Sequence, residues 1–114
     1  MNQEIQELAY AVFSGAEACE EHKTGIPWSD LDGRAIAAYM EEGDFAESSG
    51  VAIFALADGR FCVVRQWEDT TGHGCQCGGE AVIYASREEA LLQGINGDDA
   101  SQLGLTEERE GLRP

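Results

Sequence analysis

Basic residues are scarce in this sequence. Its 114 residues include 22 Asp and Glu but only 7 Lys and Arg, which gives a formal net charge of −15. Phosphate groups are repelled by a surface of that sign, so direct binding to DNA, RNA or an anionic membrane is not expected. A partner with a basic surface is compatible with the charge.

Long apolar runs are also missing. No stretch approaches the ~20 apolar residues that span a bilayer. The N-terminus carries Glu4 and Glu7 instead of a basic segment followed by an apolar one, so no signal peptide is expected. The four cysteines do not have the spacing of a secreted disulfide framework. We therefore expect a cytoplasmic protein.

Hydrophobic residues make up 43% of the chain, which is enough for a small core and excludes a disordered acidic tail. The length, with no internal repeat and no domain boundary, predicts a single α+β domain over residues 1–114. The segment from about residue 96 is polar, a composition compatible with flexibility.

Two helices are predicted in the first part of the chain. Apolar residues at spacings of three and four predict an amphipathic helix over 2–22. Ser29 as N-cap, with Asp30 and Asp32 in the first turn, predicts a second helix over 30–42.

A β-hairpin is predicted in the middle of the chain. Segments 51–57 and 60–68 flank Asp58-Gly59, a pair typical of two-residue type I′ turns. Such a turn places Ala55 opposite Cys62, where the cysteine would have a packing role. The first strand is apolar on both faces, which predicts a central, covered position in the sheet.

Three further elements complete the expected fold. They are a strand over 81–85, a helix over 86–93 with Ser86 and Glu89 in a capping box, and a short helix over 106–110. The predicted order is ααβββα, an α+β fold in which helices pack on a small antiparallel three-stranded sheet.

A glycine-rich loop contains three residues that are typical metal ligands. His73, Cys75 and Cys77 could bind zinc, the only cofactor that the sequence suggests, if a fourth ligand came from elsewhere. The alternative is a simple glycine-rich connection, because the chain has no second pair of ligands at zinc-site spacing. A nucleophilic cysteine is disfavoured, since the acidic residues around the loop favour the neutral thiol.

Acidic residues form short groups along the chain, and residues 1–50 hold 11 acidic and 2 basic ones, a balance of −9. The simple explanation is solubility. The functional one is docking on a basic partner, with carboxylates on helix faces imitating the phosphates of nucleic acid. The candidate docking residues are Glu17, Glu20, Glu21, Trp28, Asp30, Asp32, Glu41, Glu42 and Asp44.

The two tryptophans have different expected roles. Trp28 follows a proline in a loop, so it is either a lid on the core or an exposed contact for a partner. Trp67 alternates with Phe61 and Val63 on one strand face, so we expect it to pack in the core.

The segment Trp67-Glu-Asp-Thr-Thr-Gly-His-Gly-Cys-Gln-Cys77 and the helix Ser86-Arg-Glu-Glu-Ala-Leu-Leu-Gln-Gly94 resemble small acidic proteins of actinobacteria and their phages. The resemblance covers a minor part of the chain and assigns no residue a role. It implies a setting in which short accessory proteins interfere with host machinery.

The sequence shows no convincing catalytic set, so we expect a non-enzymatic binding protein. It would dock on a basic surface, for example as a nucleic-acid mimic or an inhibitor of a host nucleic-acid-binding protein. The alternative is a small metal- or redox-linked domain that uses the loop of His73, Cys75 and Cys77.

Overall fold

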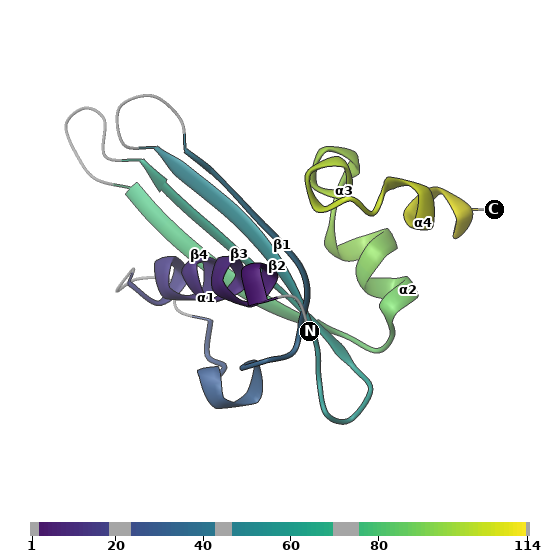
Figure 1. Cartoon of the computed structure of the whole chain (residues 1–114), viewed down its shortest axis with the longest axis horizontal. Helices are drawn as coiled ribbons and strands as arrows, with labels where there is room; N and C mark the ends of the chain where they lie inside the picture. The colour runs from purple at the N-terminus through teal and green to yellow at the C-terminus, as the bar shows by residue number, and fades with distance from the viewer. Residues whose placement is uncertain (1–2, 19–23, 43–46, 70–75, 114) are drawn as a thin grey trace.

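The computed structural model describes residues 3–18, 24–42, 47–69 and 76–113 (Figure 1). Four strands form one antiparallel sheet in the order β1-β2-β3-β4, so the α+β class is confirmed and the expected three-stranded sheet is wrong. The elements are α1 (Gln3–Glu17), the short helix η1 (Trp28–Asp30), β1 (Ala35–Glu42), β2 (Ser48–Ala55), β3 (Phe61–Asp69), β4 (Gln76–Tyr84), α2 (Arg87–Glu89), η3 (Ala90–Gly94), α3 (Gly97–Leu103) and α4 (Thr106–Gly111).

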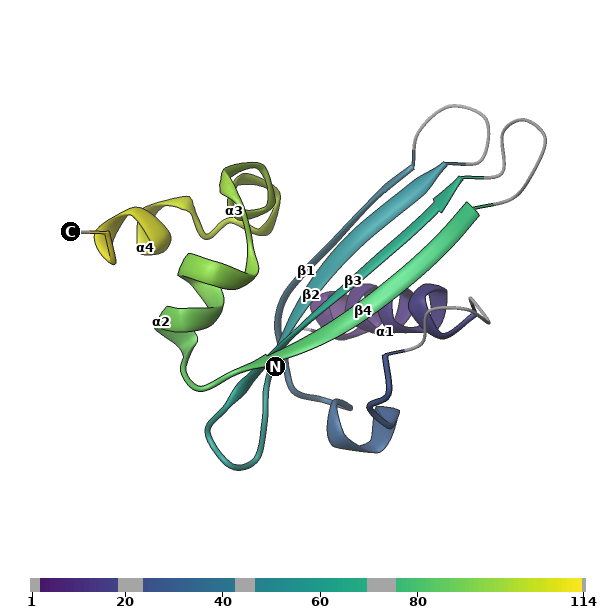
Figure 2. The same ribbon diagram turned by 180° about the vertical axis from the view of Figure 1, so that it is seen from behind.

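Helices cover both faces of the sheet, but to different extents. Helix α1 lies across one face and contacts all four strands, and we call this the α1 face. The C-terminal helices α2 to α4 lie on the opposite face, near the end where β4 leaves the sheet (Figures 1 and 2). We call this the C-terminal face. The half of the C-terminal face at the opposite end of the strands extends beyond these helices.

Alternation along the central strands produces a core on each face. On β2, Ala52 and Phe54 pack under α1, whereas Val51 and Ile53 pack against the C-terminal helices. All four side chains are buried, which confirms the central, covered position predicted for this strand.

The helix predicted over 30–42 is wrong, because most of that segment is strand β1. The chain turns after η1, and Gly33 has a φ of +76°, which interrupts any helix that begins at Ser29. The side chain of Gln6 on α1 then accepts a hydrogen bond from the Ala35 N–H and donates one to the Ala35 carbonyl, at 3.1 and 2.8 Å. These contacts and pairing with β2 select the strand.

The predicted hairpin forms, but its register differs by one residue. Cys62 pairs with Phe54 and not with Ala55. The loop holds three residues, 57–59, and the last of them, Gly59, has a φ of +91°, as in three-residue hairpin loops. The packing role of Cys62 is confirmed, since it is fully buried and burial raises the pKa of its thiol to about 11.

The C-terminal part of the chain contains more helix than its polarity suggests. The predicted helix over 86–93 forms as α2 and η3, with the Ser86 hydroxyl accepting from the Glu89 N–H at 3.1 Å. The short helix predicted over 106–110 is α4. Helix α3 was not predicted, and it begins at a capping box formed by Asn96 and Asp99.

No helix among the residues that the structure describes is long and apolar enough to cross a membrane.

Gly79 allows α1 to approach β4 closely, and this provides a test of the packing. A Cβ at this position would lie 2.4 Å from the Ala16 Cβ and 2.6 Å from its Cα. We expect Gly79→Ala to lower the free energy of unfolding by about 1–3 kcal/mol in urea titrations. In Gly97→Ala the added methyl meets no atom within 4 Å, so this control should be neutral or slightly stabilising. Equal losses in both variants would contradict the close contact.

Candidate functional site

A cleft of about 570 Å³ opens at the end of the sheet where β1 and β3 end and β2 begins. Its lining contains four glutamates, two serines and one tryptophan, and no basic side chain is among these residues. We call it the acid-lined cleft, and its residues are Glu41, Glu42, Glu47, Ser48, Ser49, Trp67 and Glu68.

Strand pairing builds one side of the cleft on the C-terminal face. Glu41 pairs with Ser49, and Ser49 pairs with Trp67, so these residues form a row across three strands. The indole of Trp67 lies against Gly78, because a Cβ on that glycine would be 2.0 Å from a ring atom. Because Gly78 has no side chain, the Trp67 indole can pack directly against the backbone of β4. The Glu41 carboxylate accepts a hydrogen bond from the Gln102 amide at 2.6 Å.

The expectation that Trp67 packs in the core is wrong. Its side chain shares a face with Phe61 and Val63 as predicted, yet it is 43% exposed. The C-terminal helices pack over the other end of that face, so strand alternation places Trp67 beyond their cover.

A second row builds the other side of the cleft. Glu42 pairs with Ser48, and Ser48 pairs with Glu68. With strands about 4.8 Å apart, the two glutamates are about 10 Å apart at the backbone. The Ser48 hydroxyl accepts a hydrogen bond from the buried Gln66 amide at 3.0 Å, which fixes its position between them.

The cleft combines negative charge with an aromatic surface. None of its glutamates takes part in an ion pair with another described residue. Carboxylates without a basic neighbour attract cations, and an indole face adds a cation–π interaction of about 0.5–1 kcal/mol at an exposed site. The cleft therefore offers a site that attracts positive charge.

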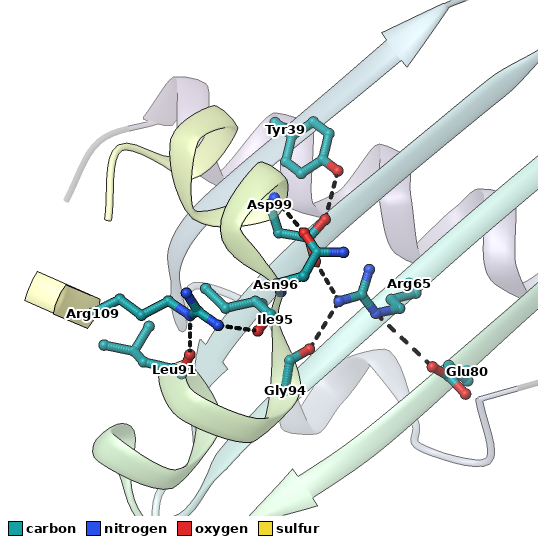
Figure 3. A network of polar contacts seen from close by, with 9 residues as sticks. All are labelled: Tyr39, Arg65, Glu80, Leu91, Gly94, Ile95, Asn96, Asp99 and Arg109. Carbon is teal, nitrogen blue, oxygen red and sulfur yellow. Dashed lines mark hydrogen bonds and ion pairs between the residues drawn. The ribbon is translucent and has the colours of Figure 1, made fainter. Parts of the chain in front are cut away.

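A partly buried polar network centred on the buried Asp99, which the sequence analysis missed, lies on the same face under α3 (Figure 3). The Asp99 carboxylate accepts hydrogen bonds from the Arg65 guanidinium at 2.5 Å, the Tyr39 hydroxyl at 2.9 Å and the Asn96 N–H at 3.0 Å. Arg65 also donates to the Gly94 carbonyl at 2.9 Å. Apart from the local Asn96–Asp99 contact, these hydrogen bonds join residues far apart in the sequence, so periodicity could not reveal them.

The network shifts the pKa values of its members. Burial would raise the pKa of Asp99, but the hydrogen bonds from Arg65, Asn96 and Tyr39 lower it overall. Burial and the hydrogen bond to Asp99 raise the pKa of Tyr39 to about 12. Because the Asp99 carboxylate is already occupied by three donors, it is a structural anion and a poor general base.

A second arginine stabilises the C-terminal helices from inside. Arg109 on α4 is buried, and its guanidinium donates to the carbonyl oxygens of Leu91 at 2.9 Å and Ile95 at 3.4 Å (Figure 3). These bonds satisfy carbonyls in and just after η3, where the helix ends. They join α4 to η3.

The described residues among those predicted for partner binding lie at several places on the molecule. Only Glu41 and Glu42 line the acid-lined cleft. Asp30 lines a different hollow beside the turn between β2 and β3, and Asp32 is exposed near Trp28. Glu20, Glu21 and Asp44 lie outside the described residues.

Two of the predicted residues have local structural roles. The Glu17 carboxylate accepts hydrogen bonds from the N–H and the hydroxyl of Thr24. Trp28 is a lid on the core, with its ring 5.2 Å from that of Phe13 and 5.9 Å from that of Phe54. Of the two readings for Trp28, these contacts favour the lid.

The predicted metal loop falls largely outside the described part of the chain. His73 and Cys75 are not described, and Cys77 on β4 is disulfide-bonded. A sulfur in a disulfide is not a thiolate ligand. Among the described residues, no three His, Cys, Asp or Glu side chains are grouped so that they could hold a metal ion.

Replacing Asp99 tests the network. The Asp99 side chain is 6% exposed, so Asp99→Asn should lower the free energy of unfolding at neutral pH by about 3 kcal/mol. The lowered pKa of the carboxylate means that its stabilisation is present at neutral pH and is lost as the pH falls through the folded-state pKa. The variant should therefore lose less stability on acidification than the parent. The exposed neighbour in Asp98→Asn is the control, and an equal loss there would argue against the network.

Tyr39 gives a test at alkaline pH. Its pKa of about 12, compared with an ordinary value of 10.0, means that the folded protein holds the phenolic proton more tightly. Stability from this group is complete below about pH 10 and declines as the pH rises towards 12. In a titration followed by tyrosinate absorbance, Tyr39→Phe should remove the step near pH 12. If that step persists in the variant, the assignment to Tyr39 is wrong.

The acid-lined cleft and the network are described from this chain alone. The chain matches no family model, no curated protein and no solved structure.

Proposed function

We propose that this protein is a non-enzymatic binding protein that docks on a basic surface of a partner protein. A lysine or arginine of the partner enters the acid-lined cleft. The observation that carries the proposal is the cleft's composition, in which four glutamates and the exposed indole of Trp67 lie together and no described lining residue is basic.

Two properties of the chain favour this function over solubility alone. The net charge of −15 attracts a basic partner from a distance and speeds its encounter. Solubility does not explain why Trp67 packs against Gly78 with its indole exposed, because an exposed indole adds nothing to solubility. The net negative charge would attract the partner, and the acid-lined cleft would provide the contact.

The described residues offer little to an enzyme. Asp99 is fully engaged by its donors, and Cys62 is a fully buried thiol with a raised pKa, which makes it a poor nucleophile. They are the deeply buried acid and thiol among the described residues.

A partner that binds nucleic acid fits the proposal, since such proteins have basic grooves. Inhibition would follow if the acidic surface occupied that groove. Glu41 and Glu42 lie on a strand, so the helical spacing of carboxylates on which phosphate mimicry was based does not apply to them. Competition for the groove requires only net complementarity of charge.

Binding of an oligolysine tests the cleft. Titration should change the fluorescence of exposed Trp67, while affinity should fall steeply with added salt. The double variant Glu41→Gln/Glu68→Gln should weaken binding by about tenfold, because it removes one carboxylate from each row. Trp67→Leu should remove the fluorescence response and weaken binding further.

The matched control is Glu88→Gln/Glu107→Gln, which removes the same charge from exposed positions on the C-terminal helices. We expect a much smaller loss of affinity in this variant. Equal losses in the two double variants would mean that only net charge matters. Affinity that does not change with salt would contradict docking on a basic surface.

A further inference from the structure

Strand β4 is an outer strand of the sheet, opposite β1 (Figure 2). On its inner side it pairs with β3 along its whole length. In the described part of the chain, residues 80–84 form no backbone hydrogen bonds on the outer side of this strand. A row of such free N–H and C=O groups is a template for pairing with a further strand.

The segment 80–84 has little of the usual protection of an edge strand, since Glu80 at its start is its only charged residue. Its pairing with β3 contains no bulge, and it contains neither proline nor lysine. Val82 and Ile83 are each 40% exposed, and they point to opposite faces of the sheet. An added strand would therefore find apolar contacts on both faces.

The opposite edge of the sheet is strand β1, and it has features that hinder the addition of a strand. Strand β1 has an irregular pairing between Ala35 and Ala37, and the Gln6 side chain occupies the backbone groups of Ala35. Its last two residues, Glu41 and Glu42, are charged. These features hinder strand addition at the two ends of β1, and the described residues show no such contact at residues 80–84 of β4.

A hollow of about 360 Å³ lies next to this edge on the α1 face. Ile83 lines it together with the apolar side chains of Ile26 and Leu56. The charged residues of its lining are Asp30, Asp58, Arg34 and Arg60, and Asp58 forms an ion pair with Arg60 at 2.8 Å. A side chain of an added strand that pointed to this face beside Ile83 would enter the hollow. Because its two acidic and two basic groups balance, the hollow itself favours an apolar side chain of the added strand.

We propose that the β4 edge at 80–84 binds an extended segment of the basic partner, which adds to the sheet as a fifth strand. This inference rests on the proposed function for the charge of the partner. A second copy of this chain is a poorer occupant, because pairing two β4 edges would bring together two molecules that each carry −15. Backbone hydrogen bonds would supply affinity, and basic side chains would supply selectivity.

The test uses a short peptide that alternates lysine and valine, and a twin that is N-methylated at alternate residues. The N-methylated twin keeps the charge, but one of its edges lacks the N–H groups that would form hydrogen bonds with β4. We expect the first peptide to slow amide hydrogen exchange within 80–84, while the twin binds at least about tenfold more weakly. In the protein, Val82→Ser/Ile83→Ser should weaken binding of the first peptide by about tenfold. The control, Tyr10→Ser on α1, removes another exposed side chain and should have no effect.

The outcomes separate this inference from the proposed function. If both peptides bind equally and exchange in 80–84 does not slow, the edge is not the site, although binding to oligolysine can still support the proposed function. If neither peptide nor oligolysine binds, both proposals fail. Protection of 80–84 that depends on protein concentration, without any peptide, would identify a second copy as the occupant and overturn the inference.

Discussion

The buried contact between Arg65 and Asp99 is the constraint on which the arrangement of the C-terminal face depends. It joins the third strand to α3, and the Tyr39 hydroxyl and the Gly94 carbonyl extend it to β1 and η3. A buried ion pair of this kind is costly to break, because either partner alone would leave an unpaired charge. The pair therefore holds the C-terminal helices over one half of the face and leaves the other half to solvent.

Both proposed binding features follow from that incomplete cover. Trp67 lies on the same strand as Arg65, one alternation further along, and is exposed because the helices end before it. Val82 on the neighbouring strand is exposed on this face too. Negative charge, an open aromatic ring and an unprotected strand edge occur together on a small protein, and each favours a basic, extended partner.

The errors in the sequence analysis have physical causes. The segment 30–42 has helical capping signals and an alanine-rich run, so only its pairing with β2 and the turn at Gly33 show that it is mostly strand. The register of the hairpin differs by one residue because Asp58-Gly59 fits loops of two and of three residues equally well. Trp67 has the alternation of a core residue, and local pattern cannot show where a covering helix ends.

The sequence alone determined the α+β class, the burial of the central hairpin, the helices around 86–93 and 106–110, and the strongly negative charge of the chain. These depend on composition, periodicity and local capping, which act over a few residues. Tertiary structure alone decided which glutamates meet, since Glu41 and Glu68 are joined only through strand register. It also decided that Asp99 is a buried structural anion and that one edge of the sheet stays open. Such features depend on contacts between distant segments, and no local pattern specifies them.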